Sequence, residues 1–469
     1  MSRRLEEFNP LNEGKVSIYS CGPTVYDLAH IGNFRSYIFA DLLGRALRLG
    51  GYQTNHAVNL TDIDDKTIRG ALARNKNASL EDLRNFTEPF IEAFFTDIKA
   101  LGIASFNHNP RATEYIDEMI ALVSKLKERG FAYEQDDSVY FSLEKNEHYG
   151  CLSHVDLSNV KSGLRYNTDE YNKEDIRDFV LWKAEKPEEN IAFDSPFGRG
   201  RPGWHLECSA MIHKTFAGPI DIHTGGVDLL FPHHENEIAQ SECAYDDDFV
   251  SYWLHCEHLL VEGKKMSKSL GNFYTLRDLQ EKGLGNYAMR YLLLSVHYRQ
   301  KLNFTIEAVG QAQNTLEKIW KGWLRLKEAR TVGPDIGPEL AENVEASKAE
   351  FLGSLQDDLN IAKALAAFHQ FLHYNNSVLD KNNNELSATD KTTLISAFDY
   401  FDQVLNILSG ADESGPEVPQ DIMALLEKRN AARSDKDYAR ADELRDQILA
   451  AGFEILDSRE GSTLQKKKQ

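Results

Sequence analysis

The segment that most constrains the fold lies within the first 60 residues. Residues 16–20 alternate in polarity as a short strand does, and a loop rich in turn-forming residues follows them. The next segment repeats its apolar residues with helical spacing, at Phe34, Tyr37, Ile38, Leu42, Ala46 and Leu49. Gly50 and Gly51 end it as C-caps do, and residues 53–60 are typical of a second strand. Strand, helix and strand in this order form a βαβ unit, which predicts the α/β class with a parallel sheet.

The pattern changes several times before residue 304. Residues 80–130 are mainly helical in pattern, and residues 131–141 are typical of a hairpin with a polar turn. Residues 142–203 are polar and contain few apolar runs, which indicates an insertion or an accessory module. The α/β pattern resumes near residue 221. We therefore expect two separated stretches of chain to build the sheet.

Beyond residue 304 the chain is helical in pattern almost throughout. Stretches rich in Gly, Pro and Ser interrupt the helices at residues 331–339 and 409–419, so we expect a helical bundle followed by a small module. In that module the pattern predicts one helix over residues 420–451 and a short strand at residues 453–456.

Composition narrows the class of protein. The chain has 469 residues, 42% of them hydrophobic, which fits about three globular domains. We expect neither a membrane span nor a signal peptide, because no apolar run reaches about 18 residues and none follows the basic start. A net charge of −20 argues against nonspecific coating of nucleic acid or membranes. Five cysteines are an odd and sparse set, which favours a reducing cytoplasmic location and metal binding over disulfides.

Two short motifs have the character of phosphate-binding sites. His-Ile-Gly-Asn at residues 30–33 begins the first predicted helix, where free N–H groups attract anions. Lys-Met-Ser-Lys-Ser at residues 265–269 can place two mobile ammonium groups, those of Lys265 and Lys268, on a polyphosphate. Each motif alone is more often an ordinary turn than a nucleotide-binding site. Their occurrence in one chain, in this order and separated by an α/β stretch, favours the functional interpretation.

This pair of motifs resembles the signature of the class I aminoacyl-tRNA synthetases, in which His-Ile-Gly-His and Lys-Met-Ser-Lys-Ser lie on a Rossmann-type sheet. Asn33 stands where that family usually has its second histidine, and its amide donates a hydrogen bond but carries no charge. The resemblance implies catalysis by positioning and electrostatics through His30, Asn33, Lys265 and Lys268. It also implies that these residues and Gly32 bind ATP, together with Mg²⁺.

A second group of residues has the character of metal ligands. Cys21 follows the first predicted strand, and Cys208 lies in Gly-Trp-His-Leu-Glu-Cys-Ser-Ala at residues 203–210. His233 and Glu237 are four residues apart in a helical segment, so they share one face. Two thiolates, an imidazole and a carboxylate suit zinc. From spacing alone, two buried core cysteines and a capping glutamate explain the same residues.

The longer stretches around these residues resemble the cysteinyl-tRNA synthetase family over nearly the whole chain. They are Cys-Gly-Pro-Thr-Val-Tyr-Asp from residue 21, Asn-Leu-Thr-Asp-Ile-Asp-Asp from residue 59, Gly-Trp-His-Leu-Glu-Cys-Ser-Ala-Met from residue 203 and Phe-Pro-His-His-Glu-Asn-Glu from residue 231. The resemblance implies one zinc ion per chain, held by Cys21, Cys208, His233 and Glu237. It places Gly22, Thr61 and Trp204 in the pocket for cysteine, and Asp228 on the adenosine side.

Such a zinc ion would explain how an enzyme separates cysteine from serine, which differ by one atom. An ordinary pocket discriminates poorly between near-isosteres, whereas zinc favours a soft thiolate. The implied reaction joins L-cysteine to tRNA(Cys) through a cysteinyl-adenylate made from ATP, for protein synthesis. The resemblance further implies a cytoplasmic monomer.

The resemblance also divides the chain into domains. It implies a Rossmann-type catalytic domain in two halves, an insertion between them, a lysine-loop region that contacts the tRNA stem, a helical anticodon-binding bundle and a small C-terminal anticodon-recognition module. In that order the boundaries are residues 1–121 and 204–262, 122–203, 263–308, 309–410 and 411–469.

Other residues near these motifs have less specific interpretations. His223, His234 and His255 fit either support of the metal ligands or ordinary polar packing. The other cysteines lack a partner at ligand spacing and are expected to be packing residues: Cys151, Cys243 and Cys256. In the last module we expect a basic strip to contact tRNA, formed by Arg429, Arg433, Lys436, Arg440 and Arg445.

Two other functions share parts of this pattern. A ligase that joins cysteine to an amino-sugar would have the same zinc site and adenylation motifs, but residues 310–469 exceed what it needs. A non-catalytic, tRNA-binding paralogue would be marked by the loss of motif lysines or zinc ligands, and both lysines and all four ligands are present.

Overall fold

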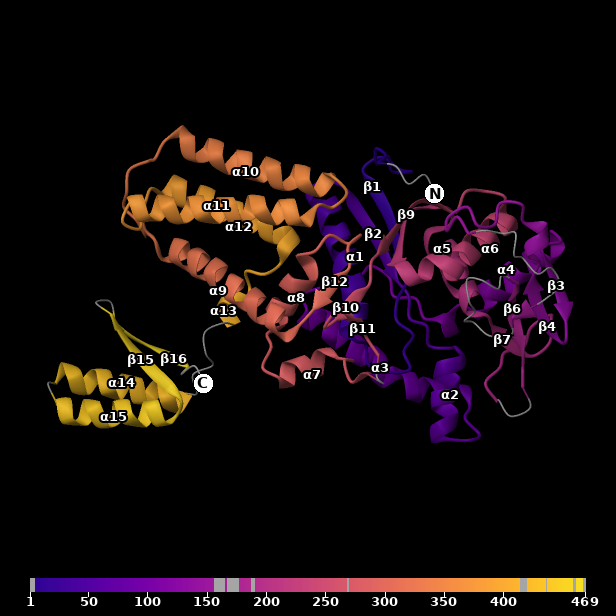
Figure 1. The fold of residues 1–469 in the computed structure, drawn as a ribbon, viewed down its shortest axis with the longest axis horizontal. Coiled ribbons are helices and arrows are strands. Elements are labelled where there is room, and N and C mark those ends of the chain that lie inside the picture. Colours follow the sequence, from indigo (N-terminus) through magenta and orange to yellow (C-terminus); the bar gives the residue numbers. More distant parts are fainter. Residues whose placement is uncertain are drawn as a thin grey trace.

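The structure is a computed structural model. It describes residues 5–155, 165–166, 177–186, 190–267, 270–413, 420–435, 437–458 and 461–466. Figure 1 shows a central α/β region with a smaller sheet on one side, a helical bundle on the other, and a small module at the C-terminal end. Among the residues that the structure describes, no helix has the length and apolar character to cross a membrane.

The central sheet is parallel throughout, which confirms the predicted α/β class. Its four strands lie in the order β2-β1-β8-β9: β1 (Lys15–Ser20), β2 (Gln53–Val58), β8 (Ile220–Gly226) and β9 (Val250–Cys256). Helix α1 (Ile31–Leu49) connects β1 to β2, so the predicted βαβ unit is present. The chain goes to one side of β1 for β2 and returns to the other side for β8. The carboxyl ends of β1 and β8 therefore form the switch point at which open α/β sheets bind ligands.

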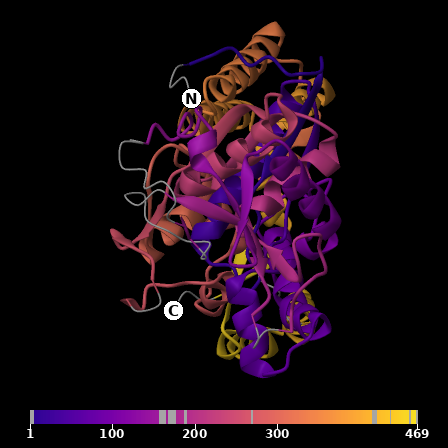
Figure 2. The same ribbon diagram turned by 90° about the vertical axis from the view of Figure 1, so that its right-hand side faces the viewer.

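A long excursion separates β2 from β8. It begins with the helices α2 (Asp65–Arg74), α3 (Leu80–Ala100), η1 (Ala112–Glu114) and α4 (Ile116–Glu128). The predicted hairpin follows as β3 (Ala132–Gln135) and β4 (Ser138–Phe141), with Asp136 and Asp137 in the left-handed conformation that tight hairpin turns require. After the short helical turn η2 (Leu143–Lys145), the remaining strands of this second sheet are β5 (Arg165–Tyr166), β6 (Asp178–Ala184) and β7 (Gly200–Pro202). Figure 2 views the molecule from the side of this sheet.

One helix leads the chain back to β8 of the central sheet, and three further helical segments connect β8 to β9. These are α5 (Trp204–Phe216), η4 (Val227–Leu229), the short turn η5 (Leu230–His234) and α6 (Glu235–Tyr245). A three-stranded sheet and two helices come next: β10 (Leu259–Val261), β11 (Lys264–Lys265), α7 (Leu276–Glu281), α8 (Asn286–Leu294) and β12 (Leu302–Phe304).

The predicted helical bundle packs directly on the central domain. Its elements are α9 (Ile306–Glu328), β13 (Arg330–Thr331), α10 (Pro338–Gln356), α11 (Ile361–Lys381), β14 (Glu385–Leu386), α12 (Ala388–Leu405) and α13 (Gly410–Glu413). One continuous hydrophobic cluster runs from β1 and α1 into this bundle. Arg290 of α8, fully buried, adds an ion pair with Asp41 of α1 at 2.7 Å and donates to the Leu405 carbonyl at 2.7 Å. The bundle is thus fastened to the helix that begins at His30.

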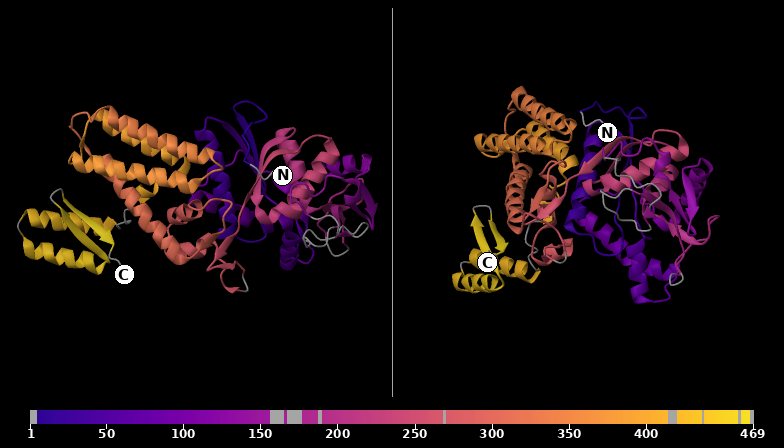
Figure 3. Two further views of the ribbon diagram at one scale, coloured as in Figure 1. Left: turned by 45° about the horizontal axis from the view of Figure 1, so that its top comes forward. Right: turned by 45° about the vertical axis from the view of Figure 1, so that its right-hand side comes forward.

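The C-terminal module corrects one prediction. Residues 420–451 do not form a single helix but two, α14 (Gln420–Ser434) and α15 (Tyr438–Ala450), followed by the hairpin of β15 (Phe453–Ser458) and β16 (Gly461–Lys466). The turn is favoured because Asp437 caps α15 by accepting the Arg440 N–H at 3.2 Å. The reversal also lets apolar residues of both helices and β15 meet in a small core of their own. Figure 3 shows this module set apart from the central sheet.

Two further expectations are wrong. Arg429, placed on an exposed basic strip, is 4% exposed and donates to Ser462 Oγ at 2.8 Å, so it ties α14 to the terminal hairpin. Lys436 of the same strip lies outside the described residues. Cys151, expected to be a packing residue, is exposed, whereas Cys243 and Cys256 are buried as expected.

Candidate active site and metal centre

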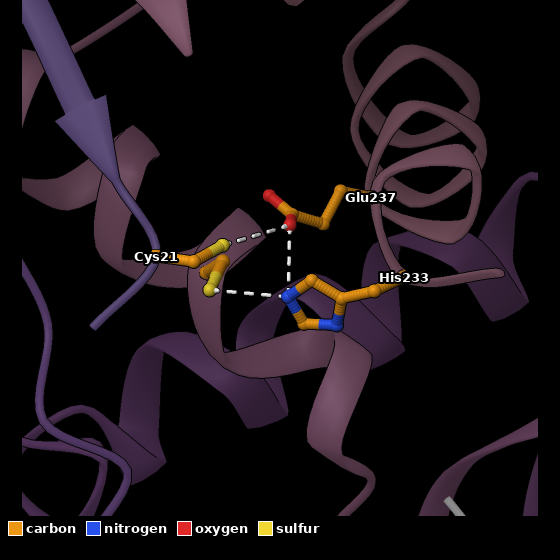
Figure 4. Close-up of side chains that lie close together, drawn as sticks. Cys21, His233 and Glu237 are labelled. Carbon is orange, nitrogen blue, oxygen red and sulfur yellow. Dashed lines mark hydrogen bonds and ion pairs between the residues drawn. The ribbon is translucent and has the colours of Figure 1, made fainter. Parts of the chain in front are cut away.

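The four predicted metal ligands meet at the carboxyl end of the central sheet. Their ligand atoms, from Cys21, Cys208, His233 and Glu237, all lie within 4.8 Å of one another. His233 Nε2 is 3.0 Å from Glu237 Oε1 and 3.6 Å from Cys208 Sγ, and Cys21 Sγ is 4.0 Å from the same Glu237 oxygen. Figure 4 shows the side chains of Cys21, His233 and Glu237 pointing toward one another. Two sulfurs, a nitrogen and an oxygen at such spacing form a donor set that fits zinc.

Three separate elements bring these ligands together. Cys21 is the first residue after β1, and Cys208 lies on α5, which packs against α6. The chain kinks at Phe231, whose φ of −140° and ψ of 132° are extended, and the helical path resumes directly after it. His233 and Glu237 then lie one turn apart on the same face, as their spacing predicts.

The cluster is buried and its charges are balanced. Cys208, His233 and Glu237 are 2%, 1% and 0% exposed. Burial raises the pKa of the Cys21 thiol, whereas hydrogen bonds with Cys21 and His233 overcome the effect of burial at Cys208 and lower its pKa to about 6. Burial also disfavours the charged form of His233, but the nearby Glu237 carboxylate raises its pKa to about 10. The site thus favours the anionic forms of Cys208 and Glu237 beside a protonated His233, and a divalent cation in place of that proton would also favour the Cys21 thiolate.

A ring of histidines supports the four ligands. His223 Nε2 lies 3.0 Å from Glu237 Oε2, and His234 Nε2 lies 3.3 Å from Cys21 Sγ while its Nδ1 contacts His255 Nε2 at 2.8 Å. The sequence left the roles of these histidines open, and the structure places them around the ligands. Cys21, His223, His234 and Glu237 also form a second set of close ligand atoms.

His205 is a further member of this ring that the sequence analysis missed. Its Nδ1 lies 2.9 Å from His233 Nδ1, and the side chain is 2% exposed. The signal was available in Trp-His-Leu-Glu-Cys, because residues three apart on a helix share a face. His205 and Cys208 therefore approach the same partner, His233, from α5.

The residues predicted to bind cysteine line up beside the metal ligands. The Gly22 N–H donates to Asn59 Oδ1 at 2.7 Å, and a Cβ at position 22 would lie 1.6 Å from the Asn59 carbonyl oxygen, so only glycine fits. The Thr61 hydroxyl donates to Glu207 Oε2 at 2.7 Å and accepts from Asn59 Nδ2 at 3.2 Å. Trp204 stacks on His233 with ring centroids 4.4 Å apart. Asn59 and Glu207 are supporting residues that the sequence analysis did not single out.

The start of α1 shows what Asn33 does in place of a histidine. Asn33 Oδ1 accepts the His30 N–H at 3.0 Å, and His30 Nδ1 accepts the Asn33 N–H at 3.2 Å, which together form a capping box. Because Nδ1 of His30 is an acceptor, a neutral His30 ring carries its proton on Nε2. The asparagine thereby fixes the orientation of the histidine and the first turn of the helix.

The second phosphate-binding motif lies next to the first. Met266 contacts this turn, since a Cβ on Gly32 would meet the Met266 methyl carbon at 3.0 Å. Lys265 is the exposed last residue of β11, and Lys268 lies outside the described residues. Asp228 follows β8 in the turn η4, and a Cβ on Gly226 would lie 2.3 Å from its carboxylate oxygen. The motifs from both halves of the sheet therefore meet at the ends of β1 and β8.

Comparisons with known proteins agree with this arrangement. Residues 7–314 match the family described as the tRNA synthetases class I (C) catalytic domain, and residues 415–463 match the cysteinyl-tRNA ligase anticodon binding domain. A cysteine–tRNA ligase from Leptospira interrogans is 48% identical over 100% of this chain and 98% of its own length. One from Brachyspira hyodysenteriae is 45% identical over the same shares of the two chains.

A solved structure supports the fold at much lower identity. Methionyl-tRNA synthetase from Mycobacterium tuberculosis, in complex with methionyl-adenylate, superposes with a TM-score of 0.58 at 17% identity and covers 88% of this chain and 94% of its own. The fold is therefore that of a class I synthetase. With relatives of 45–48% identity along its whole length, the chain belongs to the cysteine–tRNA ligase family.

Proposed function

We propose that this protein joins L-cysteine to tRNA(Cys) in an ATP-dependent reaction that passes through a cysteinyl-adenylate. Membership of the cysteine–tRNA ligase family supports the ligation itself, and hence a role in protein synthesis. The observation that carries the proposal at the level of the site is the convergence of Cys21, Cys208, His233 and Glu237 beside the phosphate-binding turn of α1. A cytoplasmic location and a monomeric state fit this role and are part of the proposal.

We assign one zinc ion per chain to these four side chains. Bound there, zinc supplies a soft Lewis acid that binds the thiolate of L-cysteine in preference to a serine hydroxyl. Gly22, with its fixed main chain, and Thr61, held between Asn59 and Glu207, form the wall that orients the rest of the amino acid. The Trp204 ring covers His233 and excludes water from that side.

Adenylation follows from the position of the α1 N-terminus. A carboxylate oxygen of cysteine attacks the α-phosphorus of ATP, a P–O bond forms, and the bond to the bridging oxygen of pyrophosphate breaks. His30 Nε2–H and Asn33 Nδ2 are the donors that we assign to the α-phosphate, and the positive end of the α1 dipole adds to their effect. Lys265 and Lys268, with Mg²⁺ on ATP, stabilise the charge on the departing pyrophosphate. Asp228 is assigned to the adenosine side.

In the second step, cysteine is transferred from the adenylate to tRNA, and we assign no residue of the metal centre to this transfer. A hydroxyl of the terminal ribose of tRNA attacks the carbonyl carbon of the adenylate, the new ester C–O bond forms, and AMP leaves. Residues 411–469 carry a small core separate from that of the central domain, so we assign them to tRNA recognition. The domain boundaries expected from the sequence stay predictions.

An aminoacylation assay tests this function directly. With radiolabelled cysteine and ATP, we expect acid-precipitable label on tRNA(Cys) and none on an amino-sugar acceptor. Label on the amino-sugar alone would favour the alternative cysteine ligase, against which the match of residues 415–463 to an anticodon-binding domain speaks. Absence of any cysteine-dependent exchange between ATP and pyrophosphate would support a non-catalytic paralogue.

Deleting residues 411–469 tests the assignment of the C-terminal module. Because all adenylation motifs precede residue 274, we expect cysteine-dependent exchange to stay near wild type and tRNA charging to fall. Charging is compared at one fixed ionic strength, since phosphate contacts are salt-dependent. Equal charging by both proteins would show that the module is not a recognition element.

A further inference from the structure

The two phosphate-binding motifs are joined through the main chain. The Ile31 N–H donates to the Tyr274 carbonyl at 3.0 Å, and His30 forms an antiparallel bridge with Thr275. The Phe273 ring packs edge-on against the His30 imidazole, with centroids 5.1 Å apart. We call the segment from Lys265 to Asn272 the lysine loop. The chain that follows it, from Phe273 to Thr275, is therefore fixed to the start of α1.

Asn272 ties the other end of the lysine loop to this anchor. Its Oδ1 accepts the Ser267 N–H at 2.8 Å, and its Nδ2 donates to the Lys265 carbonyl at 3.2 Å. One amide thus holds the main chain on both sides of Met266. The task needs a donor and an acceptor on the same short side chain, which aspartate and alanine lack.

Among its described residues, the loop has one other printed restraint within itself, the Leu270 N–H that donates to the Ser267 carbonyl and Oγ at 3.3 Å. Lys265, Leu270 and Gly271 are exposed, and β11 pairs with β10 through two residues. Lysine side chains have many rotamers, so the position of an ammonium group depends on how well its main chain is fixed. A displacement of about 1 Å at a reacting centre can lower a rate about 100-fold.

We propose that Asn272 is a positioning residue for adenylation. Its two hydrogen bonds set the path of residues 265–267, so that the ammonium group of Lys265 reaches the phosphates of ATP bound at His30. Phe273 completes the arrangement by fixing the imidazole and the loop to each other. This inference rests on the proposed function, because it presumes that the lysines act on the departing pyrophosphate.

Two substitutions at this position test the inference. Asn272→Ala removes both hydrogen bonds, and Asn272→Asp keeps the shape and the acceptor but loses the donor. The matched control is Asn303→Ala. Asn303 lies on β12, which pairs with β10, and its Oδ1 accepts the Gly263 N–H at 2.7 Å in the turn between β10 and β11. The control therefore loosens the same sheet without touching the loop.

The measurements separate positioning from a general loss of structure. The first is kcat and KM for ATP in cysteine-dependent ATP–pyrophosphate exchange. The second is single-turnover transfer of cysteine to tRNA from the isolated enzyme–adenylate complex, a step in which pyrophosphate takes no part. For both Asn272 variants we expect the exchange kcat to fall on the order of 100-fold, with transfer and the thermal midpoint near wild type. Asn303→Ala should leave both steps near wild type.

Several outcomes would overturn the inference. Near-wild-type exchange in either Asn272 variant would show that the bonds do not position the lysines. An equal fall in exchange and transfer, or the same fall in Asn303→Ala, would assign Asn272 a merely structural role. Lys265→Ala distinguishes the positioning role of Asn272 from the proposed role of the lysines in adenylation. If Lys265→Ala lowers exchange while Asn272→Ala does not, only the positioning inference fails. If Lys265→Ala leaves exchange intact, the proposed role of the lysines fails as well.

Discussion

The metal cluster and the lysine loop are two parts of one candidate site, and they are built in opposite ways. The cluster lies under α5 and α6, with Glu237 fully buried and bonded to both His223 and His233. Lys265 lies on an exposed strand of two residues, held through its neighbours rather than through its own side chain. The first is fixed by packing and hydrogen bonds, whereas in the described part of the second the Asn272 amide and a short main-chain bridge hold the chain.

The difference matches the tasks that we propose for each part. A group that discriminates between thiol and hydroxyl must present the same geometry to every amino acid, and burial with complete hydrogen bonding provides this. A group that stabilises charge on a departing product must let that product leave, and an exposed loop provides this. Substitutions should therefore affect both structure and chemistry in the cluster, but chemistry alone in the loop.

Loss of a metal ligand should have the largest effect. Cys208→Ser replaces a soft thiolate by a hydroxyl at a buried position of the ligand set, so we expect zinc to be lost. Partners one step removed from a metal usually change affinity or activity about 10- to 100-fold, so loss of a ligand should lower kcat/KM for cysteine by more than about 100-fold. Elemental analysis gives the zinc content. Full activity in a zinc-free wild-type protein would refute the assignment.

Loss of the loop lysine should come next. Lys265→Ala removes a charge that acts as pyrophosphate departs, so we expect adenylate formation to slow by about 100-fold. The affinity for cysteine, measured by equilibrium binding, and the thermal midpoint should stay near wild type, because the side chain is exposed. A fall in thermal midpoint as large as that of Cys208→Ser would show that the loop, like the metal cluster, contributes to the stability of the fold.

Acid should destabilise the buried part through His56. This side chain contacts Ser20 Oγ at 2.8 Å, and Ser20 contacts Thr224 Oγ1 at 2.6 Å, so the contacts join β2, β1 and β8 just before Cys21. Burial lowers the pKa of His56 from 6.5 to about 3. As the pH falls below about 6.5, His56 therefore becomes protonated in the unfolded chain but stays neutral in the folded protein. The contribution of His56 to the stability of the fold is complete above that pH and is lost as the pH falls toward 3.

The expected loss at about pH 5 is about 2 kcal/mol relative to about pH 7.5. In His56→Gln this part of the pH dependence should disappear, even if the variant is less stable at neutral pH. Thermal unfolding of both proteins at the two pH values provides the measurement. An unchanged difference between the two pH values in the variant would show that His56 does not carry the effect.

Removal of the aromatic cover should have the smallest effect. Trp204→Leu loses the stacking contact with His233 but keeps an apolar side chain. Such contacts contribute about 0.5–1.5 kcal/mol, so we expect KM for cysteine to rise by up to about 10-fold with zinc retained. Trp204→Phe should restore most of the affinity. Loss of zinc in the leucine variant would instead make the ring part of the metal site.

Periodicity and spacing predicted those features that depend on neighbouring residues. The βαβ unit, the hairpin with its polar turn and the shared face of His233 and Glu237 all follow from local patterns. Predictions failed where distant partners decide. Residues 420–451 have the pattern of one helix, yet α14 ends at Ser434 and α15 begins at Tyr438, because the apolar residues of the two helices pack against each other. Arg429 lies among polar residues in the sequence, which is typical of an exposed helix face, yet the terminal hairpin buries its side chain.

The sequence by itself determined the fold class, the two phosphate-binding motifs and the identity of the candidate ligands, because each depends on residue type and short-range order. Only the tertiary structure decided that Cys21, Cys208, His233 and Glu237 meet within 4.8 Å, that histidines surround them, and that Asn33 caps the helix whose first turn faces the lysine loop. The ligand cluster joins distant segments of the chain, for example in the Cys21–Glu237 contact at a separation of 216 residues. No local pattern specifies such contacts, since the packing of α5, α6 and the central sheet creates them.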